Sequence, residues 1–330
     1  MKSRILLLGL GFELELVLKH LLNNLSVDRK FLSFTRRDEN KIKSLSKLYK
    51  IAGYSGNIEA IEKWKPEIIF VGVKPQELSS VLNDIRESKF QNFKEIIFIT
   101  ASLPFGVIEE FFPGKYIANI IPDDSIDIKH PSNIVNYCSN RRENNTIEKV
   151  FRITCKKLIR IDPKEMVEFT ALACQGNPIL NLFILEYEYS NKITSFSDFI
   201  VDRFQNLITA LNGDILLENE LTKLANGYKR ALETIHLRKE LGLEILLLTF
   251  QAMIDKKESY KSDSNELKTL ISNWATVGGY EERGIEVVKE MYLESTYTNY
   301  AKLSENLIYS MVKRGKQINT KLSKELGSLL

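Results

Sequence analysis

The first half of the chain alternates short apolar runs with amphipathic segments, and this alternation constrains the fold more than any other feature. The apolar runs predict strands over Arg4–Gly9, Lys30–Thr35, Ile68–Val73, Glu95–Thr100, Lys115–Ile121 and Lys157–Ile161. The segments between them predict helices over Glu13–Asn24, Asp38–Lys50, Ile58–Lys65, Gln76–Ser88 and Phe105–Phe112. Strand and helix repeated in this order predict an α/β fold with a doubly wound parallel sheet.

The pattern changes after Asp162-Pro163. From there on, apolar residues recur at three- and four-residue spacing, and no segment reads as a strand. The expected helices are Glu165–Leu172, Pro178–Tyr189, Phe196–Leu211, Glu218–Lys239, Leu241–Lys256, Asn265–Trp274, Gly284–Leu293 and Tyr297–Lys313. We therefore expect a sheet domain over residues 1–162 and an all-helical domain over residues 163–330.

Composition restricts the class of protein. The chain has 330 residues, of which 44% are hydrophobic and 27% charged, as expected for a globular protein with two cores. The longest apolar stretches, Ile5–Leu10 and Leu241–Phe250, fall short of the roughly 18 residues that a bilayer requires, so no membrane segment is expected. The 46 cations and 43 anions nearly balance, which gives no reason to expect nucleic-acid binding.

The three cysteines, Cys138, Cys155 and Cys174, show no metal-ligand spacing and cannot all pair. We therefore predict no metal site and a reducing, cytoplasmic location. The run Ile5–Leu10 follows two cations but is too short for a signal peptide and has no small-residue cleavage site, so we interpret it as a strand.

The first strand ends in a glycine turn, Gly9-Leu10-Gly11-Phe12. Ligands of open parallel sheets bind at the carboxyl ends of the strands, and a glycine turn before a helix is the context of a Rossmann-type dinucleotide site. Gly9 would permit the tight turn, and Gly11 the close approach of a diphosphate to backbone amides. Leu14 stands where a third glycine is usual, and Glu13 would compete with a phosphate for the helix N-terminus. The alternative is a turn with a structural role only.

The second strand ends in Thr35-Arg36-Arg37. NAD-binding sites usually carry an acid here for the ribose hydroxyl, whereas cations accommodate a 2′-phosphate. These residues therefore favour NADPH as cofactor. The alternative is a pair of exposed arginines that begins a helix capped by Asp38.

The third run ends in Gly72-Val73-Lys74-Pro75-Gln76. Pro75 suits the first turn of a helix, where its missing N–H is not needed. Val73, Lys74 and Pro75 would lie beside the sugar-phosphate part of a nucleotide. The alternative is that Lys74 is merely a solvent-facing charge.

These strand ends, together with later motifs, resemble those of the pyrroline-5-carboxylate reductases, the enzymes of the last step of proline synthesis. That family carries Ala-Val-Lys-Pro-Gln where this chain has residues 72–76, a strand end in small residues like Ile99-Thr100-Ala101-Ser102, and Val-Met-Pro-Asn like Ile120-Ile121-Pro122-Asp123. Its helical domain opens with Thr-Ala-Leu-Ser-Gly-Ser-Gly-Pro, similar to Thr170–Pro178, and its Pro-Gly-Gly-Thr-Thr corresponds to Val277-Gly278-Gly279-Tyr280-Glu281. The resemblance runs in order through about residue 295.

The resemblance implies an NADPH-dependent reduction of a small cyclic imine in a homodimer whose helical domains interlock. It implies an NAD(P)-binding Rossmann-like domain, with Ala101 at the cofactor, and a helical domain for substrate binding and dimerisation. The substrate residues that it implies are Asp123, Gly176, Asn177, Gly278 and Gly279.

The chain departs from the family pattern where substrate should bind. Tyr280 and Glu281 replace the two threonines, and Asp123 replaces asparagine. An acidic pocket favours a positively charged substrate, and Tyr280 or a carboxyl such as Glu281 would be the proton donor. The alternative for Glu281 is a first-turn acid that points to water. A further alternative is a catalytically inactive relative that serves as a dimeric binding or regulatory protein.

Overall fold

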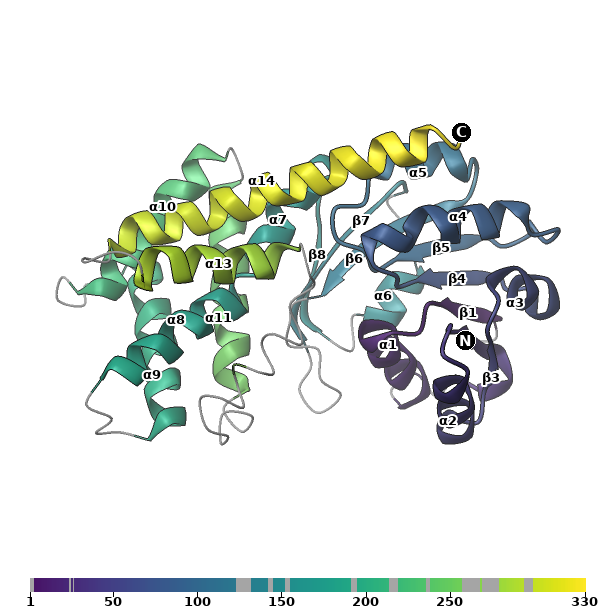
Figure 1. Ribbon diagram of the computed structural model, residues 1–330, viewed down its shortest axis with the longest axis horizontal. Coiled ribbons are helices and arrows are strands. Elements are labelled where there is room, and N and C mark those ends of the chain that lie inside the picture. Colours follow the sequence, from purple (N-terminus) through teal and green to yellow (C-terminus); the bar gives the residue numbers. More distant parts are fainter. Residues whose placement is uncertain are drawn as a thin grey trace.

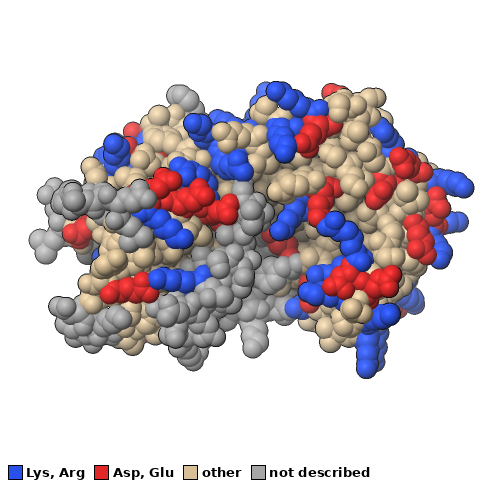
Figure 2. All heavy atoms as spheres, viewed as in Figure 1, with Lys and Arg blue, Asp and Glu red and all other residues tan. Residues whose placement is uncertain are grey.

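The protein is described by a computed structural model over residues 3–23, 25, 27–122, 132–141, 145–151, 155–190, 195–213, 219–235, 238–256, 268, 279–293 and 299–330. A sheet covered by helices occupies one end of the molecule, and a group of helices occupies the other (Figure 1). On the face drawn in Figure 2, acidic and basic side chains are interspersed over both ends.

The described residues form one eight-stranded sheet of order β3-β2-β1-β4-β5-β6-β7-β8. The strands are β1 (Ile5–Leu8), β2 (Leu32–Thr35), β3 (Ala52–Tyr54), β4 (Ile68–Val71), β5 (Glu95–Phe98), β6 (Tyr116–Pro122), β7 (Ser132–Ser139) and β8 (Cys155–Arg160). The doubly wound fold is therefore confirmed. The order reverses at β1 and β4, where such sheets bind ligands at the carboxyl ends of the strands.

The sheet differs from the predicted one in two strands. β7 runs antiparallel to β6, so the sheet is not wholly parallel. Neither β7 nor β3 was expected: β3 has three residues, none of them buried, and β7 mixes polar with apolar residues, so neither is a continuous apolar run. The second strand begins later than predicted because Arg29–Phe31 form a 3₁₀ turn, η1.

The central strands are buried on both faces because helices cover both. Along β1, Ile5 and Leu7 belong to one apolar cluster, while Leu6 and Leu8 belong to the other, as the two-residue period of a strand requires. The first cluster includes residues of α1 (Phe12–Asn23), α2 (Glu39–Tyr49) and α6 (Asn145–Phe151). The second includes residues of α3 (Asn57–Trp64), α4 (Leu78–Glu87) and α5 (Phe105–Phe111).

After β8, every described element is helical. The elements are η3 (Pro163–Glu165), α7 (Met166–Ala173), α8 (Gly176–Tyr189), α9 (Phe196–Asn212), α10 (Glu220–Thr234), α11 (Lys239–Asp255), α13 (Tyr280–Leu293) and α14 (Tyr300–Gly327). The expected helix Asn265–Trp274 lies outside the described residues except for Lys268. Among the helices of the described ranges, none has the length and apolar character that a bilayer span requires.

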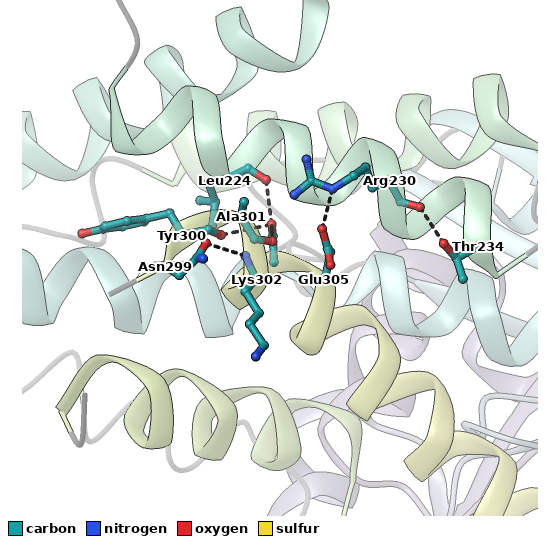
Figure 3. A network of polar contacts seen from close by, with 9 residues as sticks. Leu224, Arg230, Thr234, Asn299, Tyr300, Ala301, Lys302 and Glu305 are labelled. Atoms are coloured by element: carbon teal, nitrogen blue, oxygen red, sulfur yellow. Dashed lines mark hydrogen bonds and ion pairs between the residues drawn. The ribbon is translucent and has the colours of Figure 1, made fainter. Parts of the chain in front are cut away.

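The long helix α14 packs closely on α10 (Figure 3). Gly227 makes this possible, since a Cβ at that position would lie 2.1 Å from Oγ of Ser304. The Ser304 hydroxyl donates to the Leu224 carbonyl at 2.7 Å, and Arg230 Nε donates to Glu305 at 2.6 Å. The first half of α14 is thereby fixed to the helical part of the molecule.

The second half of α14 extends past the predicted end at Lys313 and reaches the helices of the sheet (Figure 1). Leu322 and Leu326 are buried there. Arg86 of α4 donates to the Leu329 carbonyl, and Asn319 donates to the Ser102 carbonyl at 3.1 Å. One helix therefore connects both parts of the molecule.

Candidate active site

The glycine turn after β1 has two glycines with different surroundings. Gly9 has φ +77°, and a Cβ there would lie 2.4 Å from Cγ1 of Val73, so only glycine fits. A Cβ on Gly11 would be in ordinary van der Waals contact with the Gly9 carbonyl oxygen at 3.8 Å, so the described atoms do not exclude a side chain there.

The first turn of α1 has backbone amides without a partner inside the helix. The Gly11 N–H itself donates to the Gly9 carbonyl at 2.6 Å, and the first bond of the helix runs from the Glu15 N–H to the Gly11 carbonyl. The N–H groups of Phe12 and Glu13 precede that bond, so they have no partner within the helix. An anion at this end of the helix would therefore meet these amides rather than that of Gly11.

Leu14 stands at the place of a third glycine, yet α1 still packs on the sheet. The Leu14 side chain is fully buried. A Cβ on Gly72 would lie 2.3 Å from Cγ of Leu14, so the absence of a side chain at the end of β4 provides the space that Leu14 fills.

Thr35 holds the glycine turn in place. Its buried hydroxyl accepts from the Gly9 N–H at 3.0 Å and donates to Asn57 Oδ1 at 2.8 Å. Asn57 in turn donates to Asp84 at 2.8 Å. Because its hydroxyl makes both of these bonds, Thr35 contributes to the site by holding the glycine turn in position.

The two arginines after β2 lie beside the glycine turn. The Arg36 guanidinium donates to the Leu10 carbonyl within that turn. The Arg37 side chain is 81% exposed and forms an ion pair with Glu77. Asp38 caps α2 by accepting from the amides of the helix's first turn. The Asp38 cap considered in the alternative interpretation is thus present. Both arginines still lie at the ligand edge of the sheet, by which we mean the carboxyl ends of the strands around β1 and β4.

The residues after β4 complete this edge. Pro75 begins a 3₁₀ turn, η2 (Pro75–Glu77), and the exposed Lys74 is its N-cap residue. Because β2 and β4 both pair with β1, the predicted cofactor residues of these three strand ends lie together at the switch point.

Ala101 lies half-buried after β5, next to Ser102. Ser102 has a left-handed backbone, with φ 58°, and is buried. Its hydroxyl lies 2.6 Å from that of Tyr280, and its carbonyl accepts from Asn319. The sequence indicated Ser102 only as a small residue at a strand end. It could not indicate these two hydrogen bonds, because the partners come from α13 and α14.

Tyr280 is the first residue of α13 and is only 4% exposed. Its ring packs against Gly315 so closely that a Cβ there would lie 2.0 Å from the Tyr280 hydroxyl. Burial raises the pKa of Tyr280 far above its usual range, although the Ser102 hydrogen bond acts in the opposite direction. Tyr280 therefore keeps its proton at neutral pH and joins the two parts of the molecule. Its role as a proton donor stays a prediction.

Glu281 turns inward rather than to bulk water. It is part-buried in the first turn of α13, and Oε1 accepts from Nδ2 of the buried Asn177 at 2.8 Å. Asn177 is therefore a positioning residue for this carboxylate. Gly176 packs against Met253, where a Cβ would lie 2.8 Å from the sulfur.

A second carboxylate, Glu13, lies near Glu281. Burial raises the pKa of Glu13 to about 7, and the charge of Glu281 is the second cause. The Glu13 side chain is nonetheless exposed to solvent. The sequence indicated Glu13 only as a competitor for phosphate, not as the partner of Glu281.

Two predicted substrate residues, Asp123 and Gly278, lie outside the described residues, and Gly279 is half-buried just before α13. Within the ranges that the structure describes, no group of three or more His, Cys, Asp or Glu side chains is arranged to hold a metal ion.

No protein-family model and no curated protein sequence matches the chain. Among the solved structures that are similar over nearly all of both chains are two reductases. The pyrroline-5-carboxylate reductase of Coxiella burnetii is 15% identical with a TM-score of 0.53, and covers 96% of this chain and 99% of its own. The pyrroline carboxylate reductase of Plasmodium falciparum, with NADP bound, is 18% identical with a TM-score of 0.51, and covers 96% and 98%. This chain therefore has the fold of the pyrroline-5-carboxylate reductases, as its motifs predicted.

Proposed function

We propose that this protein is an NADPH-dependent reductase of a cyclic imine, with a substrate that carries positive charge rather than a carboxylate. The observation that carries the proposal is that the Gly9–Gly11 turn, the first-turn amides of α1 and the arginines that follow β2 meet at the switch point of the sheet. Amides at a helix N-terminus suit a diphosphate, and guanidinium suits a 2′-phosphate. The residues present therefore fit the nucleotide.

Glu13 is the feature that opposes an anion in this place. With a pKa of about 7, its carboxyl is partly protonated at neutral pH. In the protonated form it does not repel a diphosphate at the same helix end. The bound coenzyme would supply a hydride, and the protein's task is to admit it and to orient the imine carbon beside it.

The start of α13 supports the choice of substrate. The Glu281 carboxylate, held by Asn177, would repel a substrate carboxylate at about 4 Å by about 1–4 kcal/mol, depending on the local dielectric. The same carboxylate stabilises a protonated imine. Hydride addition to the carbon of a protonated imine gives the amine directly, so this substrate needs no further proton from Tyr280. For a neutral imine, Tyr280 remains the proposed donor.

Turnover of NADPH with a panel of cyclic imines tests the proposal. Five- and six-membered imines without a carboxylate should be reduced at a higher kcat/KM than pyrroline-5-carboxylate. Glu281→Gln should shift that preference toward the carboxylate substrate, whereas Glu286→Gln, further along α13, should not. Efficient turnover of pyrroline-5-carboxylate alone would contradict the charge argument.

A second candidate is a catalytically inactive binding or regulatory protein. The engagement of the Tyr280 hydroxyl with Ser102 favours it, because a group so bound is less available to a substrate. Thermal unfolding with added nucleotide separates the two. A ligand at a hundred times its dissociation constant adds about 2.7 kcal/mol to the free energy of unfolding. Absence of any shift with NADPH or NADP⁺ would favour the inactive protein.

We also propose a homodimer through the helical part. A shallow groove of about 670 Å³ runs along α14 and is lined by Tyr309, Val312, Gln317, Thr320 and four lysines, Lys313, Lys316, Lys321 and Lys324. The proposal therefore requires acidic side chains of the second copy to face these lysines. The molar mass in solution, measured by light scattering, should be twice that of the chain, and a monomer at micromolar concentration would contradict this.

A further inference from the structure

The ion pair between Arg37 and Glu77 crosses the ligand edge of the sheet. Arg37 follows β2, and Glu77 closes η2 after β4. Both strands pair with β1 and therefore flank it. Since neighbouring strands lie about 4.8 Å apart, β2 and β4 are about 10 Å apart, and the ion pair connects the segments that follow them.

The two ends of this pair are held differently. Glu77 belongs to η2, where its N–H donates to the Lys74 carbonyl at 2.9 Å and Pro75 fixes the first backbone angle. The Arg37 side chain is 81% exposed, and the Glu77 side chain 36%. Exposed ion pairs of this kind are weak, so the pair opens at small cost when a stronger anion arrives.

The other charges nearby have different tasks. Arg36 donates to the Leu10 carbonyl, and Asp38 caps α2. Among the described residues, Glu77 is the acid paired with Arg37. The guanidinium that best suits a 2′-phosphate is thus already bound to a carboxylate of the same chain.

We propose that the Glu77 carboxylate takes the place of the nucleotide's 2′-phosphate on Arg37, so that Glu77 is an internal competitor that weakens and tunes NADPH binding. This inference rests on the proposed function. A 2′-phosphate offers three acceptor oxygens and more charge than a carboxylate, and guanidinium binds it with two parallel hydrogen bonds. It can therefore displace Glu77. The neutral ribose hydroxyl of NADH gives no such exchange.

Titration calorimetry with adenosine 2′,5′-bisphosphate and with AMP tests the exchange without any catalytic step. Glu77→Gln should tighten the binding of the bisphosphate and of NADPH by about two- to fivefold, because the competing charge is removed. The binding of AMP and of NADH should stay unchanged. Glu59→Gln is the matched control, since Glu59 forms an exposed ion pair with Lys63 on α3.

The double variant of Arg37 and Glu77 tests whether Glu77 acts through Arg37. Arg37→Ala alone should weaken the bisphosphate, and in that background Glu77→Gln should no longer tighten it. Two outcomes would overturn the competitor role while leaving the proposed function intact. One is that Glu77→Gln leaves bisphosphate binding unchanged, and the other is that it tightens binding equally when residue 37 is alanine. Weaker NADH binding by Glu77→Gln would show instead that Glu77 binds the ribose hydroxyl. Failure of every nucleotide to bind the wild-type protein would overturn both proposals.

Discussion

The Leu14 side chain fills the space that a side chain on Gly72 would need, because a Cβ built on Gly72 lies 2.3 Å from Cγ of Leu14. In the family pattern the helix position carries glycine and the strand end carries alanine. In this chain the helix position has the larger side chain, Leu14, and the strand end has none, at Gly72. Helix α1 thus packs on the sheet without the third glycine, and its absence is no argument against a nucleotide site.

This relationship predicts strong coupling between the two positions. Gly72→Ala should destabilise the protein by about 1–3 kcal/mol through overpacking, and Leu14→Ala by about 2–5 kcal/mol through loss of buried surface. The double variant should lose less than the sum, since each change relieves the other. Chemical denaturation of the four proteins measures this, and additive losses would contradict the packing described.

The raised pKa of Glu13 predicts that its ionisation destabilises the fold. Because the folded pKa of about 7 exceeds the ordinary value of 4.5, the favourable contribution to the free energy of unfolding is complete below pH 4.5 and is lost as the pH rises through 7. Glu13→Gln should therefore raise the melting temperature more at pH 8 than at pH 5. Glu15→Gln, in the same helix turn, is the control. An equal effect at both pH values would argue against a raised pKa.

The same carboxyl predicts pH-dependent nucleotide binding. NADPH should bind the wild-type protein more tightly at pH 6 than at pH 8, because a protonated Glu13 does not repel the diphosphate. Glu13→Gln should remove most of this difference. Dissociation constants from fluorescence titration at constant ionic strength provide the measurement, and a pH dependence that persists in the variant would assign the effect to another group.

The hydrogen bond between the hydroxyls of Ser102 and Tyr280 predicts that removing either hydroxyl costs the same part of the free energy of unfolding. Ser102→Ala and Tyr280→Phe should each cost about 1 kcal/mol, and the double variant should cost little more than either one, since all three remove the same hydrogen bond. Urea unfolding curves give the values. Two independent losses that add would mean that the hydroxyls have separate partners.

Two helical glycines with different surroundings predict opposite effects of alanine on the free energy of unfolding. Gly227→Ala would place a Cβ 2.1 Å from the Ala301 carbonyl oxygen, so it should destabilise by about 1–3 kcal/mol. At Gly106 in α5 a Cβ meets nothing within 4 Å, and Gly106→Ala should stabilise by about 0.5–1 kcal/mol through helix propensity. Melting curves compare the two, and a neutral Gly227→Ala would show that the helices can separate.

Burial explains which elements the sequence predicted. The strands β1, β4 and β5 are buried on both faces, and such strands are written as continuous apolar runs. β3 has no buried residue, so its pattern carries no comparable signal. The helix expected to end at Lys313 continues through Gly315 in the structure, where the missing side chain admits the Tyr280 ring.

The sequence by itself determined which strand ends meet, because the topology of a doubly wound sheet brings Gly9, Gly11, Arg36 and Lys74 to one edge whatever the packing details. Only the tertiary structure decided the partnerships of Glu13 with Glu281 and of Arg37 with Glu77. These pairs join residues far apart in the chain, so their approach depends on where α13 and η2 lie in the folded protein.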